Sequence, residues 1–73
     1  MTREEQIMKL WIAKDGDGAI KLFVDKPLLD SNRNIYYVDN DMEDDYISIG
    51  RYAFPEVTFE NSPQEVELKL INL

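Results

Sequence analysis

Apolar residues in the first third of the chain predict a β-hairpin that is apolar on both faces. Its strands are residues 10–14 and 19–24, with a polar loop between them. A half-buried strand should alternate apolar and polar side chains. Here the second face still carries Trp11 and Phe23, so closure of a barrel, a second copy of the chain or a partner has to cover it. The apolar residues of the first face are Leu10, Ile12, Ile20, Leu22 and Val24.

The loop of this hairpin sets its register. A three-residue loop at 16–18 keeps the two apolar sets on separate faces, whereas a slip by one residue would send every side chain to the wrong face. Asp15 suits the first position of a type I turn, and Gly18 suits the left-handed position that follows it. The pairs that this register predicts are Ile12–Leu22, Leu10–Val24 and Trp11–Phe23.

Short strands and turns are predicted along the rest of the chain. Pro27 ends the second strand, because proline cannot donate to a ladder. Turn-forming residues fill 30–34 and 61–63, and residues 51–54 could make a single helical turn that Pro55 ends. In the last strand Val66, Leu68 and Leu70 are expected to point inward. The remaining strands are expected at 35–38, 46–49, 57–59 and 65–70.

This spacing predicts a mainly β fold with residues 1–73 as a single domain. We expect a small antiparallel sheet or partly closed barrel of five to six short strands, with at most one short helix or helical turn. The alternative is an α+β fold with a short N-terminal helix, since residues 2–5 have the Thr-x-x-Glu spacing of a capping box. Otherwise residues 1–7 form a frayed leader.

The composition argues against catalysis and for oligomerisation. A 73-residue chain can build only a marginal core, and small scaffolds compensate with disulfides, a metal or self-association. This chain has no cysteine and no histidine, so it lacks a thiol nucleophile, thiolate ligands and the commonest general base. We therefore expect no enzyme activity and no cofactor. Self-association as a homodimer is the remaining way to stabilise so small a core.

The net charge of −7 is concentrated in the second half of the chain. Residues 1–33 hold six acidic and six basic residues, whereas residues 34–68 hold nine acidic residues and Arg51 alone. This balance disfavours nucleic acid and anionic membrane surfaces. No apolar run is long enough to span a bilayer, and residues 1–6 do not resemble a signal peptide. A cytoplasmic location is the expectation.

The densest acidic stretch is the loop at residues 39–45. Its first alternate carboxylates imitate an EF-hand, but Asp44 stands where glycine is needed and Gly50 where the bidentate glutamate is needed. A solvated loop is the simpler interpretation, and no metal site is predicted. The loop also supports an alternative function, in which the protein is an acidic inhibitor or nucleic-acid mimic that binds a basic partner. The acidic patch in that case is Asp39, Asp41, Glu43, Asp44 and Asp45.

Aromatic residues on the second face are the other candidate site. Trp11 and Phe23, with Tyr36, form either a second small core, under the N-terminal segment or the 51–55 turn, or a contact face, since aromatic residues dominate interface hot spots. The leading expectation is a non-catalytic interaction module that self-associates, or binds another protein, through this apolar face.

Several short segments of the chain also resemble a known group of proteins. These segments are residues 10–15 with Gly18, residues 26–27, residues 54–60 and residues 65–68. With them the chain is similar to small uncharacterised proteins encoded by gut Bacteroidetes and by their phages and mobile elements. None of the segments is a catalytic signature, so the resemblance implies a source and no activity, cofactor or site residue.

Overall fold

The computed structural model describes residues 7–39 and 46–70, and this part of the chain is mainly β, with no helix. All strand pairs are antiparallel. The strands form one four-stranded and one two-stranded sheet, which do not close into a barrel. The strands are β1 (Ile7–Lys14), β2 (Ile20–Phe23), β3 (Leu28–Asp30), β4 (Ile35–Tyr37), β5 (Tyr46–Ile49) and β6 (Gln64–Lys69).

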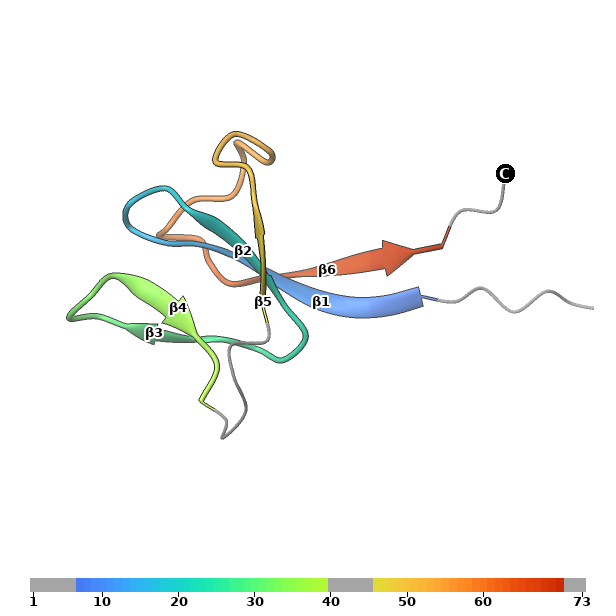
Figure 1. The fold of residues 1–73 in the computed structure, drawn as a ribbon, viewed down its shortest axis with the longest axis horizontal. Helices are drawn as coiled ribbons and strands as arrows, with labels where there is room; N and C mark the ends of the chain where they lie inside the picture. The colour runs from blue at the N-terminus through green and yellow to red at the C-terminus, as the bar shows by residue number, and fades with distance from the viewer. Residues whose placement is uncertain (1–6, 40–45, 71–73) are drawn as a thin grey trace, which may run out of the picture.

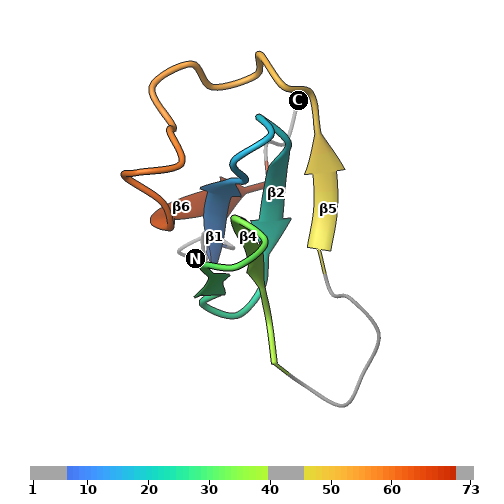
Figure 2. The same ribbon diagram turned by 90° about the vertical axis from the view of Figure 1, so that its left-hand side faces the viewer.

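The large sheet has the order β5-β2-β1-β6, and the small sheet consists of β3 and β4. Figure 2 shows the large sheet with β6, β1, β2 and β5 from left to right and β4 in front of it. The β3–β4 hairpin thus covers one side of the large sheet. The sequence did not predict β3, because its three residues, Leu28–Asp30, are too short to give an alternating pattern.

The register predicted for the first hairpin is confirmed. Trp11 pairs with Phe23 and Ile12 pairs with Leu22, while β2 ends at Phe23, one residue before Val24. The Gly18 N–H donates to the Asp15 carbonyl oxygen at 2.9 Å. Gly18 has a φ of 95°, in the left-handed region that favours glycine. The expected turn chemistry of this loop is therefore present.

Each face of the large sheet has its own small core. On one face Ile12, Ile20 and Val57 are buried together, and Leu22, Ile49 and Val66 pack against them. On the other face the buried residues are Ala13, Phe23 and Tyr36, with Trp11, Val38 and Phe59 packed around them. These two cores explain why the first hairpin is apolar on both faces. The β3–β4 hairpin covers the second core.

Residues 50–63 join β5 to β6 through turns, and here two expectations were wrong. Residues 51–54 form a turn in which the Ala53 N–H donates to the Gly50 carbonyl, with no helix. Residues 57–59 are not a strand. In a strand, positions 57 and 59 would share one face, but Val57 enters the first core and Phe59 packs against the second. The segment therefore straddles the edge of the large sheet.

The last strand is less buried than its alternating pattern indicated. Val66 is half-buried, but Leu68 and Leu70 are exposed. The N-terminal half of β1 pairs only with β6, because β2 pairs with β1 from Trp11 onward. Figure 1 shows this two-stranded part running out from the body of the molecule. The possible N-terminal helix lies outside the described residues.

Replacing Gly16 by alanine should destabilise the fold. A Cβ on Gly16 would lie 2.7 Å from the Asn34 Cβ, and the Gly16 N–H donates to the Asn34 carbonyl at 2.7 Å. The added methyl group must push apart the two loops that this contact joins, which should cost about 1–3 kcal/mol. Gly50→Ala is the matched control, since nothing lies within 4 Å of its added Cβ. Urea unfolding of both variants tests this, and equal stabilities would contradict it.

Candidate interaction surface and its supporting contacts

The structure brings Trp11, Phe23 and Tyr36 together, inside the second core of the chain. Phe23 is 2% exposed and Tyr36, which β4 contributes, is 4% exposed, and Phe59 packs against both. Trp11 is half-buried, with the Lys26 ammonium 5.4 Å from its ring centroid. Phe23 and Tyr36 are therefore too deeply buried to form an exposed contact face. Together they form a second core, which is one of the two predicted interpretations, and among the described residues β4 and Phe59 pack over Phe23.

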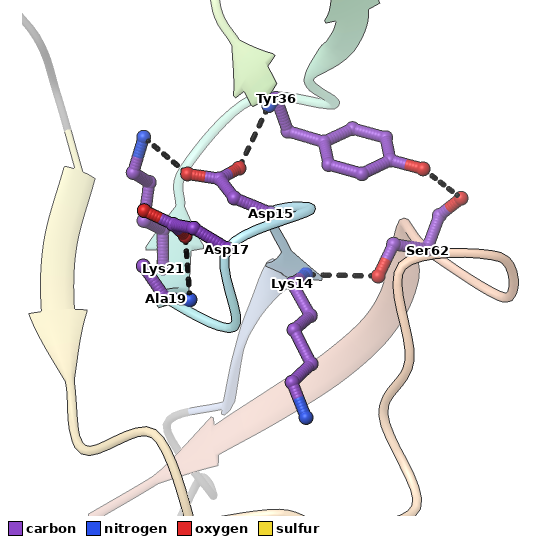
Figure 3. A network of polar contacts seen from close by, with 7 residues as sticks. All are labelled: Lys14, Asp15, Asp17, Ala19, Lys21, Tyr36 and Ser62. Carbon is purple, nitrogen blue, oxygen red and sulfur yellow. Dashed lines mark hydrogen bonds and ion pairs between the residues drawn. The ribbon is translucent and has the colours of Figure 1, made fainter. Parts of the chain in front are cut away.

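A buried carboxylate holds the β3–β4 hairpin against the large sheet. Asp15 is 3% exposed, and its Oδ1 accepts a hydrogen bond of 2.8 Å from the Tyr36 backbone N–H. Its Oδ2 lies 2.9 Å from the Lys21 ammonium. Figure 3 shows both contacts converging on Asp15 between the two sheets. A buried charge is tolerated only when it is paired and hydrogen-bonded, and both oxygens of Asp15 have partners.

The Tyr36 hydroxyl and Ser62 extend this network to the residues before β6. The Tyr36 hydroxyl lies 2.9 Å from the carbonyl oxygens of both Phe59 and Ser62. The Ser62 hydroxyl oxygen accepts a hydrogen bond of 2.9 Å from the Lys14 N–H (Figure 3). Burial, followed by the negative charges of Asp15 and Glu60, raises the pKa of Tyr36 above its usual value. Its phenol is thus held in the neutral, donating form.

Three exposed apolar side chains, Met8, Ile47 and Leu68, lie on the opposite side of the large sheet from the β3–β4 hairpin. Side chains at alternate positions share a face of a sheet, and the register places Met8 beside Leu68 and Ile47 beside Leu22. Val57 packs with Ile12 and Ile20 on this face, and Leu22 and Val66 are half-buried beside them, whereas Met8, Ile47 and Leu68 are exposed. We call these five residues, Met8, Leu22, Ile47, Val66 and Leu68, the open face.

The strand positions on this side of the large sheet carry no carboxylate. Besides the apolar residues already named, its charged or polar strand residues are Lys14 and Gln64, by the register. The charged residues of β6 point to the other side, where Glu65 forms an ion pair of 3.5 Å with Lys9. In a chain of net charge −7, the open face is therefore both apolar and free of negative charge.

Sequence reasoning did not find the open face. It treated Leu68 as an inward-pointing core residue and gave Ile47 no role, whereas both are exposed. The sequence feature that points to the open face is the apolar character of both faces of the first hairpin. It indicates that one face needs a further cover, but it does not identify that face.

The acidic patch is represented in the described residues by Asp39, which is exposed. The other members, Asp41, Glu43, Asp44 and Asp45, lie outside them. Within residues 7–39 and 46–70, no three acidic side chains are grouped so that they could hold a metal ion. The same ranges contain no helix with the length and apolar character needed to cross a bilayer.

Comparisons with protein-family models, with curated proteins and with solved structures find no match for this chain. The resemblance to small Bacteroidetes proteins stays an expectation from the sequence.

Replacing Asp15 by asparagine should lower the free energy of unfolding by about 2–3 kcal/mol, because it leaves the largely buried Lys21 ammonium without its counter-ion. The asparagine Oδ1 can still accept from the Tyr36 N–H, whereas the amide nitrogen in place of Oδ2 cannot accept from Lys21, so the loss arises on the Lys21 side. Asp17→Asn is the control, since Asp17 is exposed and its Oδ1 accepts from the Ala19 N–H at 2.9 Å, as an amide oxygen also can. Chemical denaturation compares the two, and equal losses would refute the role of Asp15.

Raising the pH above 10 should destabilise the fold through Tyr36. Its pKa is higher in the folded than in the unfolded state, so the unfolded chain loses this proton first and stability falls as the pH rises above about 10. Tyr36→Phe should be less stable at pH 7 but lose less stability between pH 9 and 11. Tyr52→Phe, at an almost fully exposed position, should retain the wild-type slope. Thermal melts across this range test the difference, and parallel curves would contradict it.

Proposed function

We propose that this protein is a non-catalytic interaction module that self-associates through the open face. The observation that carries the proposal is the exposure of Met8, Ile47 and Leu68 on one side of the large sheet, next to the half-buried Leu22 and Val66. Grouped apolar side chains on a soluble domain mark an interaction site. The proposed contact surface thus lies on the opposite side of the sheet from Trp11 and Phe23, around which the sequence predicts it.

A second copy of the chain is the partner that the charges favour. Two chains of net charge −7 repel each other, so they can meet closely only where each presents little negative charge. The open face meets this condition, because the acidic residues of β6 lie on the opposite side of the sheet. Aliphatic side chains have no donor or acceptor pattern to match. The same patch can therefore pack on itself about a two-fold axis.

The two-stranded end of the large sheet gives a further reason for self-association. Residues 7–10 pair with β6 on one side only, and Ile7, Met8 and Leu68 are exposed there. A two-stranded ribbon is marginally stable in water unless something packs against it. Stacking a second sheet on the open face would bury the apolar side of this ribbon and supply the missing layer.

The size of the open face predicts a weak dimer. A standard interface buries about 800 Å² per partner, which is roughly an eighth of the 6066 Å² surface of the protein. The open face has five side chains, two of them half-buried, which is fewer than the roughly 20–30 residues that a standard interface has on each side. The dimer should therefore dissociate on dilution, with a dissociation constant on the order of micromolar or higher.

The variant Leu68→Lys should abolish self-association at unchanged stability, because it puts a charge among the apolar side chains of two stacked faces. Leu28→Lys is its matched control. Leu28 is 52% exposed on β3, away from the open face, and Leu68 is 56% exposed. Sedimentation equilibrium between about 10 μM and 1 mM should show dimer formation for the wild type and for Leu28→Lys only.

Salt provides an independent readout of the same proposal. Screening of the repulsion between two acidic chains should strengthen an apolar dimer at 0.5 M salt. A wild-type chain that is monomeric at all concentrations and salts, or a Leu68→Lys variant that dimerises like Leu28→Lys, would overturn the proposal. Association with a basic protein that is lost at high salt would favour the acidic-mimic alternative instead.

A further inference from the structure

A cavity of about 540 Å³ lies between the β3–β4 hairpin and the β2–β5 half of the large sheet. It is on the covered side of the sheet, opposite the open face, because Lys21, Phe23 and Tyr46 belong to that side. Its volume falls within the range of small-molecule sites in proteins. The cavity is separate from the proposed dimer surface and is lined by different residues.

The walls of the cavity are rich in aromatic side chains. Phe23 and Tyr46 lie on adjacent strands of the large sheet, with ring centroids 5.8 Å apart at an interplanar angle of 45°. Residues 35–37 of β4 also line it, although the Tyr36 ring points away from Lys21, toward Ser62 (Figure 3). Such a lining favours a planar ring, since aromatic pairs gain energy from tilted or offset packing beyond the area they bury.

Two cations, Lys21 and Arg33, line the cavity together with one carboxylate, Asp30, among the residues that the structure describes. The Asp15 carboxylate pairs with Lys21 at 2.9 Å. The Arg33 side chain is 77% exposed, and its Nε lies 3.9 Å from Asp30, too far for a strong ion pair. Because both carboxylates already accept from Lys21 or from backbone N–H groups, the site favours an anionic ligand over a cationic one.

Lys21 has hydrogen-bonding capacity that the fold does not use. Its ammonium has three N–H donors, and it contacts Asp15 at 2.9 Å and the face of the Tyr46 ring at 4.7 Å. Within the described ranges, no second oxygen acceptor lies at hydrogen-bond distance from it. The Lys21 ammonium and the Tyr46 ring therefore line the same cavity. A ligand with a hydrogen-bond acceptor attached to an aromatic ring would complement both groups.

We propose that this cavity binds small planar aromatic carboxylates. The ring packs against Tyr46, the carboxylate accepts a hydrogen bond from Lys21, and the Arg33 guanidinium attracts it at the mouth. The negative charge of the protein opposes binding, so a ligand as small as benzoate should bind with a dissociation constant on the order of millimolar. The proposal is independent of self-association, because the open face lies on the other side of the sheet.

Titration with benzoate, followed by amide chemical shifts at constant ionic strength, tests the site. Saturable shifts should appear at residues 21, 23, 36–38 and 46. Benzamide, which lacks the charge, and cyclohexanecarboxylate, which lacks the π system, should each bind at least about threefold more weakly. Shifts that do not saturate, that spread over the surface, or that are equal for the three compounds would overturn the proposal.

The variant Arg33→Gln should weaken benzoate binding about three- to fivefold and leave the fold intact, because this side chain is mostly exposed. Lys9→Gln is the matched control. Lys9 also carries one positive charge and is 69% exposed, but it lies on the β1–β6 ribbon and does not line the cavity. Equal weakening by both variants would mean a general charge effect and would refute the site. Leu68→Lys should leave benzoate affinity unchanged, which separates this test from that of the dimer.

Discussion

The buried carboxylate of Asp15 joins the two sheets of this protein. Asp15 directly follows β1, and its oxygens accept from the Tyr36 N–H of β4 and pair with the Lys21 ammonium of β2. Nearby, the Gly16 N–H donates to the Asn34 carbonyl at 2.7 Å. These contacts fix the small sheet against one particular side of the large sheet. The position of the second core, the cavity and the open face all follow from that choice of side.

The chain stabilises two thin cores without a disulfide. Residues 57–62 cross the edge of the large sheet, so Val57 completes the first core and Phe59 packs on the second. Ser62 then anchors the crossing, because its hydroxyl accepts from the Lys14 N–H and its carbonyl lies next to the Tyr36 hydroxyl. A small domain buries a limited fraction of its surface. Dividing apolar residues between two faces makes each core smaller still, and one face is left partly uncovered.

The two sides of the large sheet consequently have different chemistry. One side is aliphatic, free of carboxylates at its strand positions and exposed over Met8, Ile47 and Leu68, as a surface for a second copy would be. The other side is aromatic and polar, and it holds Lys21 at the wall of a cavity. The alternation of side chains along each strand separates these properties, so a change on one side can leave the other intact.

The local features of this protein could be predicted from its amino-acid sequence. The register of the first hairpin follows from segregation of Ile12 and Leu22 from Trp11 and Phe23, and the positive φ of Gly18 follows from the loop length. The turn at 30–34 was also predictable, because the Asp30 carboxylate accepts backbone N–H groups two and three residues on. These features depend on residues close in sequence, whose geometry a short pattern can specify.

Contacts between residues far apart in the sequence select the apolar face that is covered. The sequence indicated that both faces of the first hairpin are apolar, but Asp15 and Tyr36, which settle the matter, are 21 positions apart. An alternating pattern in β6 indicates two faces without saying which meets a neighbour, so Leu68 was expected inward and is exposed. Val57 and Phe59 have the spacing of a strand, yet they separate into different cores. Long-range contacts made these choices, because local patterns fix the face of a side chain but not what packs against it.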